Sequence, residues 1–157
     1  MNTRASSDQN HQRQDLMLEA EFLSEGEVTT PNLAKIFSRA FFKTSVDIDG
    51  DLAIHCEGLI TALIICKNQK LLRFMTVFRF EESASESQRL TFVNRLNDEI
   101  LLVRFSASSP HPDQLVADYY IPYEGGISTL QIITAHRLFA RVVPNAIGSC
   151  DYDSIVK

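Results

Sequence analysis

Three segments of the chain carry apolar residues at steps of three and four, the pattern of an amphipathic helix. The first runs from Thr30 to about Phe42, with Thr30 as the expected N-cap and Pro31 as the first helical residue. The other two begin after Ser85 and Ser128, each followed three residues later by a glutamine, which predicts a capping box. The last helix is expected to end near Pro144, because proline lacks the amide hydrogen that a helix interior uses.

Six other segments alternate apolar and polar residues, or are short and apolar throughout, and predict β-strands. Turn signals such as Asp49-Gly50 separate consecutive strands, so the sheet should be largely antiparallel. One strand, Leu59–Ile65, is almost continuously apolar, which predicts a central strand covered on both faces. The expected strands are Ser45–Ile48, Leu52–Cys56, Leu59–Ile65, Leu71–Phe80, Leu101–Phe105 and Leu115–Ile121.

The order of these elements is helix, four strands, helix, two strands and helix, which indicates an α+β fold. Between the last strand and the last helix, Gly125 and Gly126 should include at least one residue at positive φ, since the chain turns sharply there. The inward positions of the periodic segments should form one core, made of Leu33, Ile36, Phe37, Leu63, Phe74, Phe78, Val93, Leu96, Phe105, Leu130 and Ile133.

A chain of 157 residues suits one domain. We expect a flexible or docking N-terminal segment over residues 1–29, an α+β domain over 30–148 and a loose C-terminal tail over 149–157. The polar N-terminus lacks the apolar core of a signal peptide, and the longest apolar stretch, Leu59–Cys66, is too short to span a bilayer. These features predict a cytoplasmic protein without membrane contact.

Charge limits the possible partners. Lys plus Arg number 15 and Asp plus Glu number 20, for a net charge of −5, and no segment of five or more residues is solidly basic. Nucleic-acid binding needs clustered cations for phosphate contacts, so no nucleic-acid partner is expected. Another protein, or a second copy of this chain in a homodimer, is the expected kind of partner.

The sequence holds no recognisable catalytic or cofactor-binding motif. Two of the three widely spaced cysteines lie in apolar runs, which predicts buried thiols, and no two of the four histidines have metal-ligand spacing. His136 is expected at the core edge of the last helix. The run Asp47–Asp51 looks like a calcium loop, but Gly58 stands where that loop needs its bidentate glutamate, so an Asx-type turn is expected instead. We therefore expect no catalytic residue, no cofactor and no metal site.

The long strand Leu71–Phe80 has one feature that a simple core strand does not explain. Its phenylalanine-rich side should meet the helices, so alternation places its other side outside. That side mixes arginine, methionine and valine, a composition that resembles protein interfaces. With additions from the last two strands, we predict a protein-binding surface of Arg73, Met75, Val77, Arg79, Arg104 and Tyr120. The alternative is that the N-terminal segment covers this face within the chain, through Leu16, Leu18 and Phe22.

From about Leu33 to Val143 the chain resembles the YbjN domain family, bacterial proteins related in fold to type III secretion chaperones. The resembling segments are Val46–Leu52, Phe92–Asn97 with its Asn-x-x-Asn, and Asp118–Ser128 with its acidic-Gly-Gly turn before the last helix. The resemblance implies a secretion-chaperone-like fold, an antiparallel sheet with helices packed on one face. It also implies a regulator or chaperone-like protein, and no catalytic residues come with it.

The sequence leaves three hypotheses for function. The first is a non-catalytic, chaperone-like or regulatory domain that binds another protein or itself through its sheet. The second is an accessory structural subunit whose partner grips the N-terminal segment. The third is a small enzyme with an unrecognised active site, which is disfavoured because no nucleophile–base pair or metal set is visible.

Overall fold

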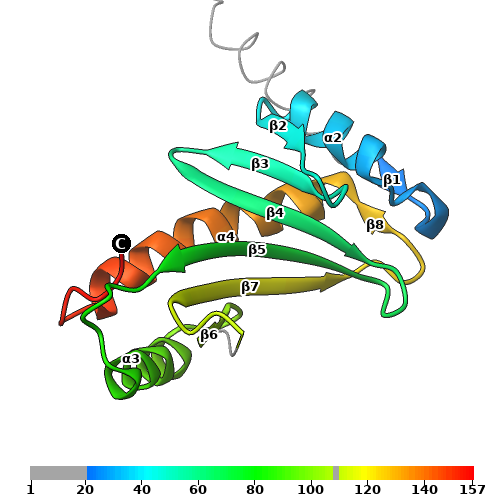
Figure 1. Cartoon of the computed structure of the whole chain (residues 1–157). Coiled ribbons are helices and arrows are strands. Elements are labelled where there is room, and N and C mark those ends of the chain that lie inside the picture. Colours follow the sequence, from blue (N-terminus) through cyan, green and yellow to red (C-terminus); the bar gives the residue numbers. More distant parts are fainter. Residues whose placement is uncertain (1–20, 108–109) are drawn as a thin grey trace, which may run out of the picture.

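The computed structural model describes residues 21–107 and 110–157, and its main element is a six-stranded antiparallel sheet (Figure 1). The strands lie in the order β2-β3-β4-β5-β7-β6, and a short second sheet pairs β1 with β8. The fold is α+β, as predicted. The strands are β1 (Phe22–Leu23), β2 (Lys43–Val46), β3 (Leu52–Cys56), β4 (Leu59–Cys66), β5 (Leu71–Arg79), β6 (Arg104–Ala107), β7 (Gln114–Pro122) and β8 (Ile127–Ser128).

The helices of the described part are α2 (Thr30–Arg39), α3 (Glu86–Glu99), α4 (Thr129–Cys150) and a short 3₁₀ helix, η1 (Glu25–Glu27). The N-cap of α2 is Thr29, so the predicted cap is wrong by one residue. Ser85 forms the predicted capping box of α3, since its hydroxyl accepts the amide of Gln88 and its own amide donates to the Gln88 side chain. Ser128 caps α4 by accepting the amide of Gln131 at 3.1 Å.

The core lies between α4 and the inner face of the sheet, where α4 runs behind the central strands (Figure 1). Phe74 of β5 lies in its middle, with ring centroids 5.9 Å from His136 and 6.3 Å from Phe139 of α4. Nine of the eleven predicted core residues are buried. Phe78 is only partly buried, and the prediction for Leu130 is wrong, because this side chain is 39% exposed.

The turn between β2 and β3 depends on one aspartate. The carboxylate of Asp47 accepts the amides of Asp49 at 3.0 Å and Asp51 at 2.9 Å, so the predicted Asx-type turn is confirmed. Because these bonds start the turn at Asp47, Ile48 is 100% exposed and the strand ends at Val46, two residues earlier than predicted.

The chain between α3 and β6 differs from the expected strand. Leu101 and Leu102 are 85% and 66% exposed, and Leu102 has a φ of 74°. Asn97 joins the two elements, because its side-chain amide donates to the carbonyl of Phe105 and accepts the amide of Phe105, both at 2.9 Å. With this register fixed, the residues after α3 form the reversal and the strand begins only at Arg104.

The C-terminal part of the chain packs on the domain. Helix α4 passes through Pro144 and ends at Cys150, so both the predicted helix end and the predicted loose tail are wrong. Cys150 is buried, and its carbonyl accepts a hydrogen bond from Arg95 of α3 at 2.7 Å. Ile155 is also buried, and the amide of Lys157 donates to the end of β5. Packing of the last helical turns against α3 offsets the hydrogen bond that a proline cannot donate.

Burial of the cysteines follows the prediction only in part. Cys150 is buried, whereas Cys56 and Cys66 are half-buried, so the expected burial of those two thiols is wrong. Both lie at the ends of their strands, where the sheet covers an apolar side chain less completely than at its centre.

Both glycines before β8 have positive φ, 76° at Gly125 and 107° at Gly126, as predicted. A Cβ atom on Gly126 would lie 2.3 Å from the ring of Phe22 and 2.6 Å from the carbonyl oxygen of Leu23. The absence of a side chain at Gly126 therefore lets β1 approach β8.

Replacing Gly126 by alanine is expected to lower the free energy of unfolding by about 1–3 kcal/mol, because backbone strain and the contact with β1 add together. Gly125→Ala is the matched control, since a Cβ there meets nothing within 4 Å and only the backbone cost remains. Urea unfolding of both variants measures the difference. Equal losses would show that the close approach of β1 contributes nothing.

Candidate functional site

One side of the main sheet faces away from α2, α3 and α4, and we call it the open face (Figure 1). On β4, Ile60 is 56% exposed, and Ala62 and Ile64 are half-buried. The prediction that this strand is covered on both faces is therefore wrong for the part of the chain that the structure describes. The open face carries Lys43, His55, Ile60, Ala62, Ile64, Arg73, Met75, Val77, Arg79, Arg104, Val116, Asp118 and Tyr120.

All six residues of the predicted surface lie on the open face. The strand register places Arg73 opposite Tyr120, and Met75 and Arg104 on either side of Asp118. The guanidinium carbons of Arg73 and Arg104 lie 5.6 Å and 5.7 Å from the ring centroid of Tyr120. The structure thus brings four of the predicted residues together around one carboxylate.

Val77 and Arg79 lie farther along β5. Val77 is 44% exposed and pairs with Val116 of β7. Arg79 is at the end of the strand, with its side chain 72% exposed and 3.5 Å from Asp113. An exposed ion pair of this length holds neither side chain firmly, so Arg79 belongs to the rim of the open face.

Asp118 is the residue that the sequence reasoning missed. It is 1% exposed although it lies on the open face, because two arginines cover it. Arg73 donates one hydrogen bond to its carboxylate at 2.7 Å, and Arg104 donates two, at 2.9 Å and 2.7 Å. The signal was a carboxylate two residues from Tyr120 on the same strand side, but only the register shows that both arginines reach it.

The charges of this cluster are fixed at neutral pH. Burial works to raise the pKa of Asp118, but the hydrogen bonds from Arg104 and Arg73 outweigh burial and leave the pKa below its ordinary value. The hydrogen bonds that Arg104 donates to Asp118 raise the pKa of Arg104. An ionised carboxylate that is already bonded to two arginines is poorly suited to proton transfer, whereas an arginine held in place is well suited to recognition.

The alternative cover for the open face, by the N-terminal segment, can be placed only in part. Leu16 and Leu18 lie outside the described residues. Phe22 pairs with Ser128 in the small sheet and lies beside Lys35 and Ile36 of α2, so its side chain does not cover the open face.

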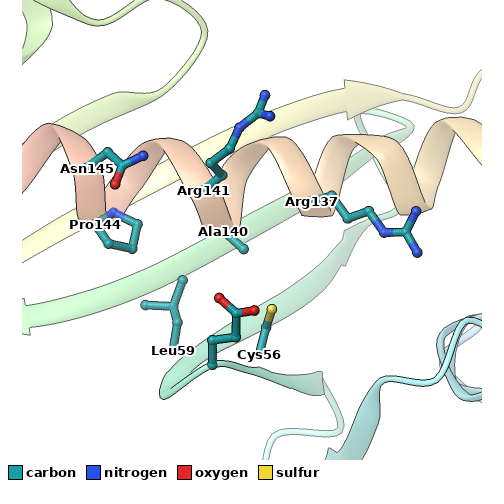
Figure 2. Close-up of a pocket in the computed structure, with 8 residues that line it drawn as sticks. Cys56, Leu59, Arg137, Ala140, Arg141, Pro144 and Asn145 are labelled. Carbon is teal, nitrogen blue, oxygen red and sulfur yellow. The ribbon is translucent and has the colours of Figure 1, made fainter.

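A cleft of about 410 Å³ lies on the other side of the sheet, between α4 and the hairpin of β3 and β4 (Figure 2). Cys56 points its sulfur toward α4, while Arg137 and Arg141 direct their guanidinium groups away from the cleft. No histidine lines the cleft, and its one carboxylate is Glu57, which follows Cys56 in the turn between β3 and β4. The cleft therefore lacks the cysteine–histidine pair that activates a thiol nucleophile.

Among residues 21–107 and 110–157, no three His, Cys, Asp or Glu side chains lie together in a group that could hold a metal ion. Within the same ranges, no helix has the length and apolar character needed to cross a membrane.

Comparison with known proteins identifies the family. No curated protein matches the chain. The crystal structure titled "YbjN, a putative transcription regulator from E. coli" is similar to this chain, with a TM-score of 0.67 and 12% identity, over 82% of this chain and 94% of that one. The family model YbjN, described as "Putative bacterial sensory transduction regulator", matches residues 29–144. This match covers most of the chain, and the chain therefore belongs to the YbjN family.

Proposed function

We propose that this chain is a non-catalytic regulatory domain, chaperone-like in the sense that it binds another protein in the cytoplasm through its open face. The observation that carries the proposal is the row of aliphatic side chains on that face, where Ile60 and Val77 are 56% and 44% exposed. Clustered apolar side chains with arginine, methionine and tyrosine among them are typical of interfaces. Descriptions of the family and of the similar structure as regulators support a binding role.

The geometry of the two candidate regions favours binding over catalysis. On the open face, the carboxylate of Asp118 is committed to Arg73 and Arg104. In the cleft, the lining residues include Cys56 and the carboxylate of Glu57 but no histidine. Neither region offers a cysteine or serine nucleophile paired with a histidine, the pair that many hydrolytic and transfer enzymes use.

Photo-crosslinking in the native cell tests the proposal. A benzophenone amino acid at Val77 should form adducts with a second protein. The matched control is Leu90 of α3, which is 49% exposed and so equally accessible, but lies off the sheet. Mass spectrometry of the adducts should identify a partner from position 77 that is absent from position 90.

The adducts also separate the alternatives. Adducts from position 77 to residues 1–20 of the same chain would contradict the proposal and support intramolecular cover. Adducts to a second copy would support a homodimer instead. Equal adducts at both positions would show no preference for the open face.

The variant Val77→Asp tests the open face by a binding measurement in solution. We expect this variant to lose binding of the recovered partner while its melting temperature falls by no more than about 4 °C, because an exposed position tolerates a charge. Leu90→Asp should retain binding. A large fall in melting temperature for Val77→Asp alone would show that the open face is buried within the folded chain.

A further inference from the structure

The open face differs in charge from the chain as a whole. The net charge of the chain is −5, yet the strand positions of the open face carry Lys43, Arg73, Arg79 and Arg104 against a single carboxylate, Asp118. That carboxylate is buried and ionised beneath two of the arginines. The surface that a partner meets is therefore positive, on an otherwise acidic protein.

One arginine of this cluster is held in place and still has donor capacity to offer. Arg104 uses Nε and Nη2 to bind Asp118, and its Nη1 has no hydrogen-bond partner within the described chain. Its side chain is 62% exposed, so a ligand can reach it. Because Asp118 already fixes the guanidinium, a new hydrogen bond costs little additional side-chain entropy.

Apolar side chains surround this donor. Met75 lies on the far side of Asp118 from Arg104, and Val77 and Val116 form the next row of the open face. A ligand that fills the face must therefore offer an anion beside aliphatic groups. A protein segment with acidic and aliphatic side chains at every second position has this chemistry, because an extended segment presents positions i, i+2 and i+4 on one side.

We propose that the open face binds an acidic, aliphatic segment of another protein, with a carboxylate of that segment at Arg104 and its aliphatic side chains over Met75 and Val77. This inference rests on the proposed function and names the chemistry of the partner. Charge complementarity across such a contact speeds association and selects the partner.

Charge also separates this partner from two others. In a symmetric dimer through the open face, the same positive patch of both copies would meet, and like charge disfavours that contact. A nucleic acid needs a row of cations along its phosphates, whereas aliphatic residues of β4 and β5 interrupt the cations here.

A library of random peptides displayed on phage and selected against the immobilised full-length chain tests the inference. The selected pool should be enriched in Asp and Glu spaced two residues from aliphatic residues, and peptides made from it should bind more weakly as NaCl is raised. Arg104→Gln should weaken their binding by between about tenfold and a hundredfold, the usual loss of a hydrogen bond to a charged group. Arg104→Lys keeps the charge without the planar fork and should give a smaller loss.

Arg141→Gln is the matched control, because it removes an exposed arginine from α4, on the other side of the sheet, and should leave binding unchanged. If Arg104→Gln melts at a lower temperature than the native chain, peptide binding by Arg104→Lys is compared with binding by Arg141→Gln instead. Weaker binding by Arg104→Lys supports the inference, and equal binding contradicts it.

The other outcomes overturn the inference. If the selected peptides are not enriched in acidic residues but lose binding to Val77→Asp, the claim of an acidic partner is overturned. The proposed function then still stands. Equal binding by Arg104→Gln and Arg141→Gln overturns the inference as well. So does self-association of the chain in sedimentation that Arg104→Gln abolishes, or binding of a DNA or RNA fragment that depends on Arg104. The proposed function itself fails only if the crosslinks at Val77 fail.

Discussion

Replacing Phe74 by alanine is expected to lower the free energy of unfolding by about 3–5 kcal/mol, the usual cost of removing a buried phenylalanine ring. Phe74 has 0% exposure and lies between the centre of the sheet and α4. Its ring contacts three aromatic rings, with centroids 6.4 Å from Tyr119, 5.9 Å from His136 and 6.3 Å from Phe139. The neighbours come from two elements, so they cannot all move into the space that the ring leaves.

Phe78 provides the matched control for this experiment. It lies on the same strand and the same inner side as Phe74, but it is only partly buried. Phe78→Ala should therefore cost less, roughly 1–2 kcal/mol, since less apolar area is lost to water. Urea unfolding at neutral pH measures both variants. Equal losses would contradict the placement of the core centre at Phe74.

Local patterns predicted the strands and the helix starts because their causes are local. Alternation along β5 fixed which side of that strand faces the helices, and a serine three residues before a glutamine fixed the start of α3. The predicted helix end at Pro144 was wrong because a contact distant in the sequence stabilises the rest of α4. The helix continues to Cys150, which packs against α3. Steps of three residues place Leu90 on one stripe with Val93 and Leu96, yet Leu90 is 49% exposed and Phe92 is buried. The position of β6 decides which side of α3 is covered.

Only the part of the candidate site that lies on β5 could be predicted from the sequence. Alternation alone placed Arg73, Met75 and Val77 on one side of β5. The binding of Arg73 and Arg104 to Asp118 depends on the register of three strands, which no local pattern contains. An aspartate in a strand otherwise rich in apolar residues indicated that Asp118 has a polar partner. It did not show that the partners are Arg73 and Arg104.

His136 shows a second feature that periodicity could not supply. The sequence suggested the core edge, but the side chain is 0% exposed, with ring centroids 5.2 Å from Phe37, 4.9 Å from Phe42 and 5.9 Å from Phe74. Neither ring nitrogen has a hydrogen-bond partner in the described structure. Burial, and to a smaller extent the charge of Arg137, lowers the pKa of His136 from its ordinary 6.5 to about 4.

His136 should therefore make the fold sensitive to mild acid. The unfolded chain binds a proton at His136 near its ordinary pKa, and the folded chain does so only near pH 4, so the stability is fully present above pH 6.5 and is lost as the pH falls toward 4. Across that window the loss from this group is about 3 kcal/mol. His136→Leu should remove this part of the pH dependence. His111→Gln, which replaces an exposed histidine, should retain it. Urea unfolding at several pH values measures all three chains, and an unchanged pH dependence in His136→Leu would refute the assignment.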